Sequence, residues 1–438
     1  MFWIGEPRCS QKAFNRFSSG PKGRDQGRQL DDMTHRILYL SPYFWPEEIG
    51  SAPYCTDLAI WLRERGHDVR VVSFRPHYPN PGLFKAWRDG SRDEEIHADI
   101  PITRVPVSDR GRGRFKDRVW NDLSFFLQVS LRCLRGEFKN TEVVVAYVPT
   151  ILTLYCARLV RLFTGASIIC VVHDIESGLA ASLNLAKSGP VLFFMRLVER
   201  VGLNFAEHVV VLSGAMQQEI QLIGCRRATS VLSIWASVAD FSAIERDQTF
   251  TVMYSGNFGK KQNLDQLLPL IQRLSQEKQA IRVVLQGDGS ERGRLQEKIA
   301  RLGVNNTVFL PLVPAEKLLA ALQAANIHVV PQSLNVATYS LPSKLFSIMA
   351  AGRPFVCIAE KGSPLDELAQ RSGAGLCVHP GDEDALYNAI AELANDHDRQ
   401  NRMGQNGRRL VENNMNKGSI LKAYEDIIAR CFRPQPAR

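Results

Sequence analysis

A short segment in the second half of the chain carries residue types that suit a bound anion. Residues 339–358 read YSLPSKLFSIMAAGRPFVCI, and this stretch lies between two apolar, strand-like runs. Pro342 can open a helix there because its missing N–H would have had no partner, and Gly352 suits the helix end. Ser343 is a good N-cap type, and Lys344 adds a positive charge beside the free N–H groups of the first turn. The pattern suits a phosphate site, but an ordinary capped helix with a solvated lysine has the same pattern.

Two glycine-rich turns follow apolar runs in the same half of the chain. The first follows TVMYS and combines small residues with cations: Gly256, Asn257, Gly259, Lys260 and Lys261. The second follows IRVVLQ and consists of Gly287, Asp288 and Gly289. Backbone N–H groups in such turns, helped by a lysine, can hold a diphosphate. We therefore expect a second and a third anion-binding element beside the first.

Two strand ends in the first half also carry candidate residues. His173, Asp174 and Glu176 follow the run ASIICVV, and in open α/β sheets ligands bind at the carboxyl ends of the strands. A reactive histidine would stand there, although a lone histidine can also be purely structural. Gly50 and Ser51 follow the run RILYLS and its long loop. They could let backbone approach a phosphate or a sugar, or form a plain strand-to-helix loop, and the absence of GxGxxG disfavours a nicotinamide cofactor.

The order of the elements predicts an α/β protein with two doubly wound, Rossmann-like domains that face each other across a cleft. Strand-like runs alternate with helix-like segments in two series, as in parallel βαβ units. We place a first domain at 34–245, a second at 246–412, and a C-terminal helix and tail at 413–438 that packs back at the junction. Residues 1–33 are polar and basic, and we read them as a disordered extension or as an overcalled start with Met33 as the initiator. The cleft is the natural ligand site.

Bulk composition narrows the class of protein. The 438 residues carry a net charge of +9, with 45% hydrophobic and 23% charged residues, as in a globular protein with anionic partners. No apolar run approaches the roughly 18 residues of a membrane helix, and the N-terminus lacks the apolar core of a signal peptide. The nine cysteines occur singly, with no CxxC or other paired spacing. This pattern predicts reduced thiols in the cytoplasm and no zinc site.

A basic and aromatic segment between Arg104 and Phe126 could dock on an anionic membrane surface, at the inner face of the plasma membrane. Its residues are Arg104, Arg110, Arg112, Arg114, Lys116 and Arg118, followed by Trp120, Phe125 and Phe126. The alternative is a solvated loop followed by a core-facing helix. Nucleic acid is disfavoured because no recognition motif accompanies the charge.

Taken together, the motifs are familiar. From about Arg36 to Cys431 the chain resembles the GT-B glycosyltransferases of family 4, particularly the branch that builds colanic-acid-type exopolysaccharide. The matching segments are YFWPEEIGSAPYCTDLAIWLRERGHDVRVVSFRPHYP, VVHDIESG, SGNFGKKQNLDQLL, QGDGSER, FLPLVPAEKLLAAL and LPSKLFSIMAAGRP. They are specific only as a set.

The resemblance implies a UDP- or GDP-linked nucleotide-diphospho-sugar in the second domain, and a saccharide or polyprenyl-diphosphate-linked glycan as acceptor in the first. It implies no cofactor, no metal, and usually retention at the anomeric carbon. Lys344 and Lys261, or its neighbour Lys260, would bind the diphosphate, and His173 would face the donor sugar. The full set for substrate binding is Gly50, Ser51, Asp174, Gly256, Asn257, Lys260, Gly287, Asp288, Gly289, Pro342, Ser343, Leu345 and Ser347.

The chain departs from the family pattern in two places. Asn257 stands where an arginine is usual, and Tyr339 and Ser347 stand at the two glutamates of the E-x7-E pattern. Because Ser347 cannot make the two ribose hydrogen bonds of a carboxylate, the ribose must be bound differently. The absence of an evident carboxylate pair suits front-face transfer better than double displacement. A nucleotide-sugar epimerase of similar fold and an inactive nucleotide-sugar-binding protein are the competing readings.

Overall fold

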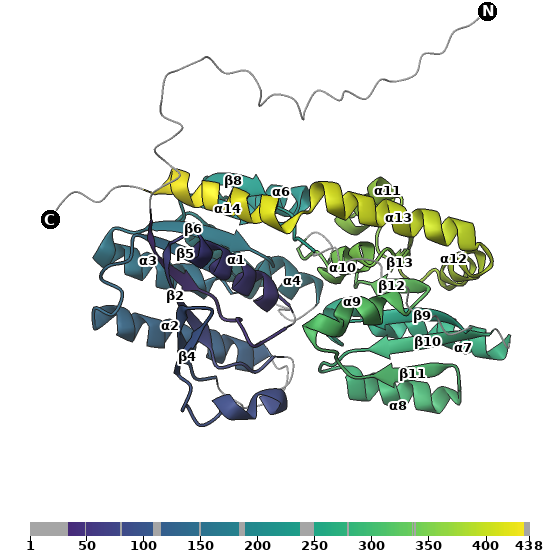
Figure 1. Cartoon of the computed structure of the whole chain (residues 1–438). Helices are drawn as coiled ribbons and strands as arrows, with labels where there is room; N and C mark the ends of the chain where they lie inside the picture. Colours follow the sequence, from purple (N-terminus) through teal and green to yellow (C-terminus); the bar gives the residue numbers. More distant parts are fainter. Residues whose placement is uncertain are drawn as a thin grey trace, which may run out of the picture. The chain divides into compact units, whose positions relative to one another are not determined.

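Two separate sheets, parallel except for one strand pair of the first, organise the described part of the chain (Figure 1). The computed structural model describes residues 34–48, 50–78, 81–107, 115–148, 150–183, 189–236, 249–277, 280–334, 336 and 339–432, except for the side chains of 115–118 and 315. The predicted extension at 1–33 and the predicted domain boundary near Arg246 lie outside these residues.

The first sheet has eight strands in the order β3-β4-β2-β1-β5-β6-β7-β8, and all neighbours are parallel except the β3–β4 pair. Its strands are β1 (Arg36–Leu40), β2 (Asp68–Phe74), β3 (Glu94–His97), β4 (Ile100–Val105), β5 (Val143–Val148), β6 (Ser167–Val172), β7 (His208–Val211) and β8 (Ala228–Val231). Its helices are α1 (Ala52–Glu64), the 3-10 segment η2 (Pro81–Trp87), α2 (Phe115–Leu134), α3 (Leu152–Thr164), α4 (Glu176–Ser182), α5 (Gly189–Leu203) and α6 (Gly214–Ile223). Central strands such as β5, VVVAYV, are apolar throughout and buried throughout, as expected of a sheet covered on both faces.

The second sheet has six parallel strands in the order β11-β10-β9-β12-β13-β14. Its strands are β9 (Phe250–Ser255), β10 (Ile281–Gln286), β11 (Thr307–Leu310), β12 (Ile327–Pro331), β13 (Phe355–Ile358) and β14 (Gly375–Val378). Its helical segments are η3 (Lys260–Gln262), η4 (Leu264–Leu267), α7 (Leu268–Gln276), α8 (Arg292–Leu302), α9 (Ala315–Gln323), α10 (Lys344–Ala350), α11 (Pro364–Ser372), α12 (Glu383–Asn395) and α13 (His397–Asn414). In both sheets the strand order reverses once, so the predicted pair of doubly wound, Rossmann-like domains is confirmed.

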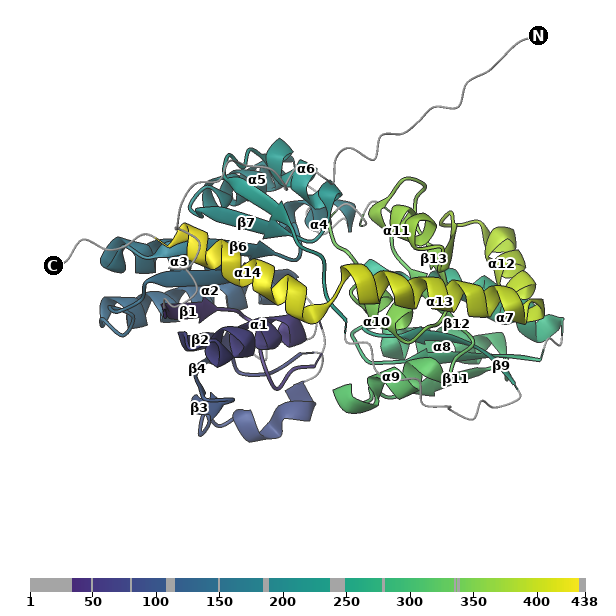
Figure 2. The same cartoon turned by 45° about the horizontal axis from the view of Figure 1, so that its top comes forward.

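The last helix, α14 (Lys417–Cys431), returns to the first sheet, where it contacts α1 and β6 (Figure 2). Tyr424 is buried there, and the indole Nε1 of Trp61 donates a hydrogen bond to Glu425. Lys417 forms an ion pair with Asp57 at 2.8 Å. The helix therefore covers the α1 side of the first sheet. Within the described residues, no helix has the length and apolarity needed to cross a bilayer.

The segment predicted to dock on a membrane is only partly exposed, so the prediction needs a correction. Arg104 is 1% exposed and lies 2.6 Å from Glu95, and its guanidinium also donates to the carbonyl of Phe74. Phe125 is fully buried, whereas Trp120 is exposed. Arg104 was misassigned because its partner comes from the β3–β4 hairpin, which the sequence did not predict. Arg110, Arg112 and Arg114, and the side chains of Lys116 and Arg118, lie outside the described residues.

Candidate functional site

Lys344, the first residue of α10, points its ammonium at the carboxyl end of β9. Its Nζ is buried and makes no hydrogen bond with the described residues, and it lies 3.7 Å from the ring centroid of Tyr254. A Cβ built on Gly256, which follows β9, would lie 3.1 Å from this Nζ. Burial lowers the pKa of Lys344 to about 7. An unpaired buried ammonium is unfavourable, so this atom is prepared to receive an anion.

The two glycine-rich turns interlock beside Lys344. A Cβ on Gly287 would lie 1.8 Å from the carbonyl oxygen of Gly256, and one on Gly289 would lie within 2.7 Å of the backbone of Phe258. The N–H of Phe258 donates to the carbonyl of Asp288 at 2.8 Å. These glycines are therefore required by close packing of the two turns at positive φ, whether or not a ligand also approaches them.

Lys261 joins the second sheet to the end of β6. Its Nζ lies 2.7 Å from Oδ2 of Asp174, and both side chains are partly exposed. The carbonyls of Lys260 and Lys261 accept hydrogen bonds from Ser333, which ties the cationic turn to the loop after β12. Two of the predicted site residues are thus brought together directly.

The loop before α10 also pairs with the end of β6. Asp174 and Ser340 form an isolated antiparallel bridge, and the N–H of Ile175 donates to the carbonyl of Tyr339 at 3.1 Å. The ring of Tyr339 rests on Gly178, since a Cβ there would lie 2.1 Å from its Cδ1. Tyr339 occupies the position of the first glutamate in the family pattern, and here its ring packs against Gly178.

His173 lies at the end of β6 with one ring nitrogen already engaged. Its Nε2 hydrogen bonds with the hydroxyl of Tyr147, and its ring packs 5.9 Å from that of Tyr54. Burial is the main cause that lowers the pKa of His173 to about 4, so the ring is neutral at pH 7. Tyr54 also hydrogen bonds with Ser343, the residue before Lys344. His173 therefore has only Nδ1 and its carbonyl left for a ligand.

The two carboxylates beside His173 have separate environments. Asp174 faces Lys261, whereas Glu176 turns inward and accepts a hydrogen bond from the N–H of Ile151 at 3.1 Å. Burial raises the pKa of Glu176 to about 8, so its carboxyl group is mostly protonated at neutral pH. It is next to Glu199, which is buried and bonds to Ser177. Of these two carboxyl groups, only that of Asp174 forms an ion pair at this strand end.

The remaining predicted residues have less distinctive surroundings. Gly50 has φ +69°, and a Cβ built on it would lie 3.6 Å from the ring of Tyr78, while Ser51 is the N-cap of α1 without a side-chain cap hydrogen bond. Leu345 is fully buried and its N–H donates to the carbonyl of Pro342, so its side chain cannot reach a ligand. Ser347 lies partly buried on α10.

The structure adds three tyrosines that the sequence analysis missed: Tyr54, Tyr147 and Tyr254. All three lie in elements read as core, and their hydroxyl or ring faces the candidate site. A tyrosine two residues before a strand-end glycine, as in MYSG, is the one local signal that could have marked Tyr254.

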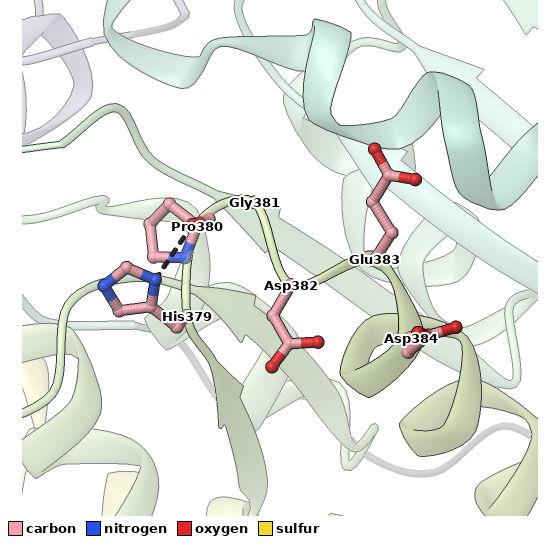
Figure 3. Close-up of a pocket in the computed structure, with 6 residues that line it drawn as sticks. All are labelled: His379, Pro380, Gly381, Asp382, Glu383 and Asp384. Atoms are coloured by element: carbon pink, nitrogen blue, oxygen red, sulfur yellow. Dashed lines mark hydrogen bonds between the residues drawn. The ribbon is translucent and has the colours of Figure 1, made fainter.

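A shallow surface depression of about 550 Å³ follows β14 and is lined by residues 379–384 (Figure 3). The ring of His379 hydrogen bonds with the carbonyl of Pro380 at 2.9 Å. The carboxylates of Asp382, Glu383 and Asp384 point in different directions in Figure 3. None of the predicted residues lines it, and its acidic groups do not converge on one point, so it is not the candidate site.

Comparisons with known families match both halves of the chain. Residues 50–235 match the model described as glycosyl transferase 4-like domain, and residues 239–410 match glycosyl transferases group 1. A protein of Escherichia coli (strain K12) named as a colanic acid biosynthesis glycosyl transferase, WcaI, is 28% identical over 382 residues, covering 82% of this chain and 91% of that protein. A protein of Pseudomonas aeruginosa named as a glycosyltransferase, WbjE, is 24% identical, covering 67% of this chain and 76% of its own.

Solved structures share the whole fold. Sucrose-phosphate synthase of Thermosynechococcus elongatus superimposes with a TM-score of 0.73 at 18% identity, covering 91% of this chain and 99% of that one. HepE of Anabaena, solved in complex with UDP-glucose, gives a TM-score of 0.65 at 17% identity, covering 90% and 100%. The predicted GT-B arrangement is confirmed by these likenesses.

Proposed function

We propose that this chain helps to build a cell-surface polysaccharide. The premise is that it belongs to the GT-B glycosyltransferases, with a glycosyl transferase 4-like first domain and a second domain of glycosyl transferases group 1. In this proposal it moves a sugar from a UDP- or GDP-linked donor to a saccharide or polyprenyl-diphosphate-linked acceptor. The likeness to WcaI supports the pathway class, and the UDP-glucose complex of HepE supports the donor class.

The observation that carries the proposal is the buried Nζ of Lys344, which has no hydrogen-bond partner among the described residues. A donor diphosphate bound over Gly256 would place an oxygen anion beside this ammonium and restore its positive charge. Charge-assisted hydrogen bonds of this kind are among the strongest in proteins. The interlocked turns at Gly256 and Gly287 give the backbone the small surface that such an approach needs.

Lys261 would supply the second positive charge. In the structure its ammonium is paired with Asp174, so the donor has to compete with, or insert beside, this ion pair. Partly exposed ion pairs contribute little to stability, at most about 1 kcal/mol, and a doubly charged diphosphate is the stronger partner. Asp174 would then be free to orient a hydroxyl of the donor sugar.

The transfer we propose retains the anomeric configuration and needs no metal ion. The bond between C1 and the phosphate oxygen breaks, and the nucleoside diphosphate leaves with the electron pair. The acceptor hydroxyl attacks C1 from the same face and passes its proton to the leaving oxygen. Lys344 and Lys261 offset the charge that develops on the diphosphate, as an oxyanion hole does. His173, neutral and held by Tyr147, would position the sugar.

A cytoplasmic location, at the inner face of the plasma membrane, belongs to the same proposal. The eight cysteines that the structure describes are free thiols and six of them are buried, which suits a reducing compartment.

A thermal-shift panel of UDP, GDP and their sugars tests the proposal, followed by transfer assays with the donor that stabilises the protein. We expect one nucleoside diphosphate to raise the melting temperature of the wild type, and Lys344→Met to abolish that rise. Lys317→Met, at an exposed lysine of α9, is the matched control. Unchanged nucleotide binding in Lys344→Met, or no stabilisation of the wild type by any nucleotide, would refute the assignment.

The same panel separates the competing functions. Conversion of the donor sugar without any acceptor would identify an epimerase, and nucleotide binding without turnover would identify an inactive binding protein. The second alternative has a specific observation in its favour, because Ser347 replaces the ribose-binding carboxylate of the family pattern.

A further inference from the structure

Two cysteines lie opposite each other on neighbouring strands at one edge of the second sheet. Cys357 on β13 and Cys377 on the edge strand β14 are register partners in this parallel pair, and both are free thiols. Neighbouring strands lie about 4.7–4.9 Å apart, and the two Cα atoms of a disulfide lie about 4.4–6.8 Å apart. Register partners also point their side chains to the same face of a sheet. The backbone of β13 and β14 therefore has a spacing that a disulfide accepts.

The two sulfur atoms both reach into the gap between these strands. Sγ of Cys357 donates a hydrogen bond to the carbonyl of Leu376 on β14, at 3.4 Å. Sγ of Cys377 donates one in the opposite direction, to the carbonyl of Ala359 just beyond β13, at 3.7 Å. The two thiols also hydrogen bond with each other. Each sulfur thus lies toward the strand of the other, so the side chains are already turned toward one another.

The two thiols differ in their access to solvent. Cys357 is fully buried in the cluster that includes Leu365 and Leu368 of α11, the helix that joins the two strands and contacts both (Figure 2). Cys377 packs against the same cluster but is partly exposed. The hydrogen bond with Cys377, together with burial, raises the pKa of the Cys357 thiol, which is therefore protonated at neutral pH. A dissolved reagent meets Cys377 first, with Cys357 as the buried thiol beside it.

We propose that Cys357 and Cys377 form a reversible dithiol–disulfide site that reacts with low-molecular-weight disulfides. The sulfur of Cys377, after loss of its proton, attacks one sulfur of the small disulfide and expels the other as a thiolate. The sulfur of Cys357 then attacks the sulfur of Cys377 and expels the second small thiolate. Two protein thiols are oxidised, the small disulfide is reduced to two thiols, and the two protein protons end on those thiols.

Such a site fits a reducing compartment. Disulfides of cytosolic proteins are usually transient, so the pair stays reduced until small disulfides accumulate. Because Cys377 is partly exposed, its disulfide is open to attack by a reducing thiol, which makes the bond reversible. The disulfide ties the edge strand β14 to β13 and closes a loop that contains α11. Neither cysteine belongs to the candidate site of the transferase.

Treatment of the folded, reduced, full-length protein with glutathione disulfide tests this site. Peptide mapping by mass spectrometry without reduction should show Cys357 linked to Cys377, and dithiothreitol should restore both thiols. In Cys357→Ala the second step is blocked, so a mixed disulfide of Cys377 with glutathione should be at least tenfold more abundant than in the wild type. In Cys377→Ser, Cys357 should remain an unmodified thiol. Cys431→Ser, at another partly exposed cysteine, is the matched control and should form the linked peptide as the wild type does.

Melting temperature and far-UV circular dichroism check that the variants are folded. Cys377→Ser changes a partly exposed side chain to one of nearly the same size, so it decides the test even if Cys357→Ala does not fold. A wild type that retains glutathione on Cys377 without the linked peptide overturns the proposal. A linked peptide that forms only after unfolding in denaturant, or no reaction at either thiol, also overturns it. No donor or acceptor is present in this experiment, so failure of the transferase assignment would leave it intact.

Discussion

Replacing Lys344 by methionine should stabilise the free protein while it removes nucleotide binding. Methionine keeps most of the volume of the side chain and can contact the ring of Tyr254 through its sulfur. It removes a buried ammonium that has no hydrogen-bond partner among the described residues. The wild type is therefore expected to carry a stability cost that the variant lacks.

The size of this cost follows from the pKa. Burial lowers the pKa of Lys344 to about 7, against about 10.4 in an unfolded chain. Between these two values the unfolded chain binds more protons than the folded protein, so the stability of the wild type rises with pH. The advantage of Lys344→Met is then about 4 kcal/mol at pH 7, about 3 kcal/mol at pH 8 and about 2 kcal/mol at pH 9.

Differential scanning calorimetry at these three pH values measures the effect. An advantage of about 3 kcal/mol corresponds to a melting temperature on the order of 5–10 °C higher for a domain of this size. Saturating nucleoside diphosphate should reverse the order, because it stabilises only the wild type. Lys317→Met should match the wild type throughout. A variant that is less stable than the wild type, or an advantage that does not fall with pH, would refute the account of Lys344 as a buried, unpaired charge.

Three further predictions concern the packing around the site. Gly178→Ala should lower the melting temperature and the activity, because its methyl group would overlap the ring of Tyr339, and adding Tyr339→Ala should recover part of both losses in a double-mutant cycle. Gly287→Ala should abolish nucleotide-induced stabilisation in the thermal-shift assay, since its Cβ would meet the carbonyl of Gly256; normal nucleotide binding would contradict this. Burial lowers the pKa of His173 to about 4, so His173 does not change its charge near pH 6.5. The pH profile of kcat/KM near pH 6.5 should therefore have the same shape in the wild type and in His173→Gln.

Much of the second domain's site was predictable because its signals are local. Glycine at a strand end and the start of a helix depend on neighbours in sequence. The glycines lie where we expected them, and Ser343 is the N-cap of α10, but its side chain makes no cap hydrogen bond and Pro342 lies before the helix. The direction of Lys344 was not predictable, since it depends on the ring of Tyr254, which lies on β9 some 90 residues earlier. The contact between Lys261 and Asp174 joins residues of different sheets and gives no signal in either segment.

The segment from Arg104 to Phe126 shows the opposite case, because its sequence pattern overestimated the exposure of Arg104 and Phe125. Basic residues near aromatic ones suggested an exposed segment, yet Arg104 is buried by a hairpin that brings Glu95 to it. The helix α5 gave no warning of its exposed side, because large apolar residues occur on every side of PVLFFMRLVERVGL and only three of its residues are charged. Only the positions of α2, α3 and α5 on one side of the sheet distinguish inner from outer residues.

The return of α14 to the first sheet has a consequence for synthesis on the ribosome. The ribosome makes α1 and β6 early and makes α14, which covers them, much later. The contacts that hold α14 there are those of Trp61 with Glu425 and of Asp57 with Lys417. At ~5–20 residues per second, the more than 350 residues between α1 and α14 take on the order of half a minute to emerge. During that interval the nascent first domain has an uncovered side, and a chain that stops short of α14 never closes it. Premature termination before or within α14 should therefore be read out as misfolding of the first domain.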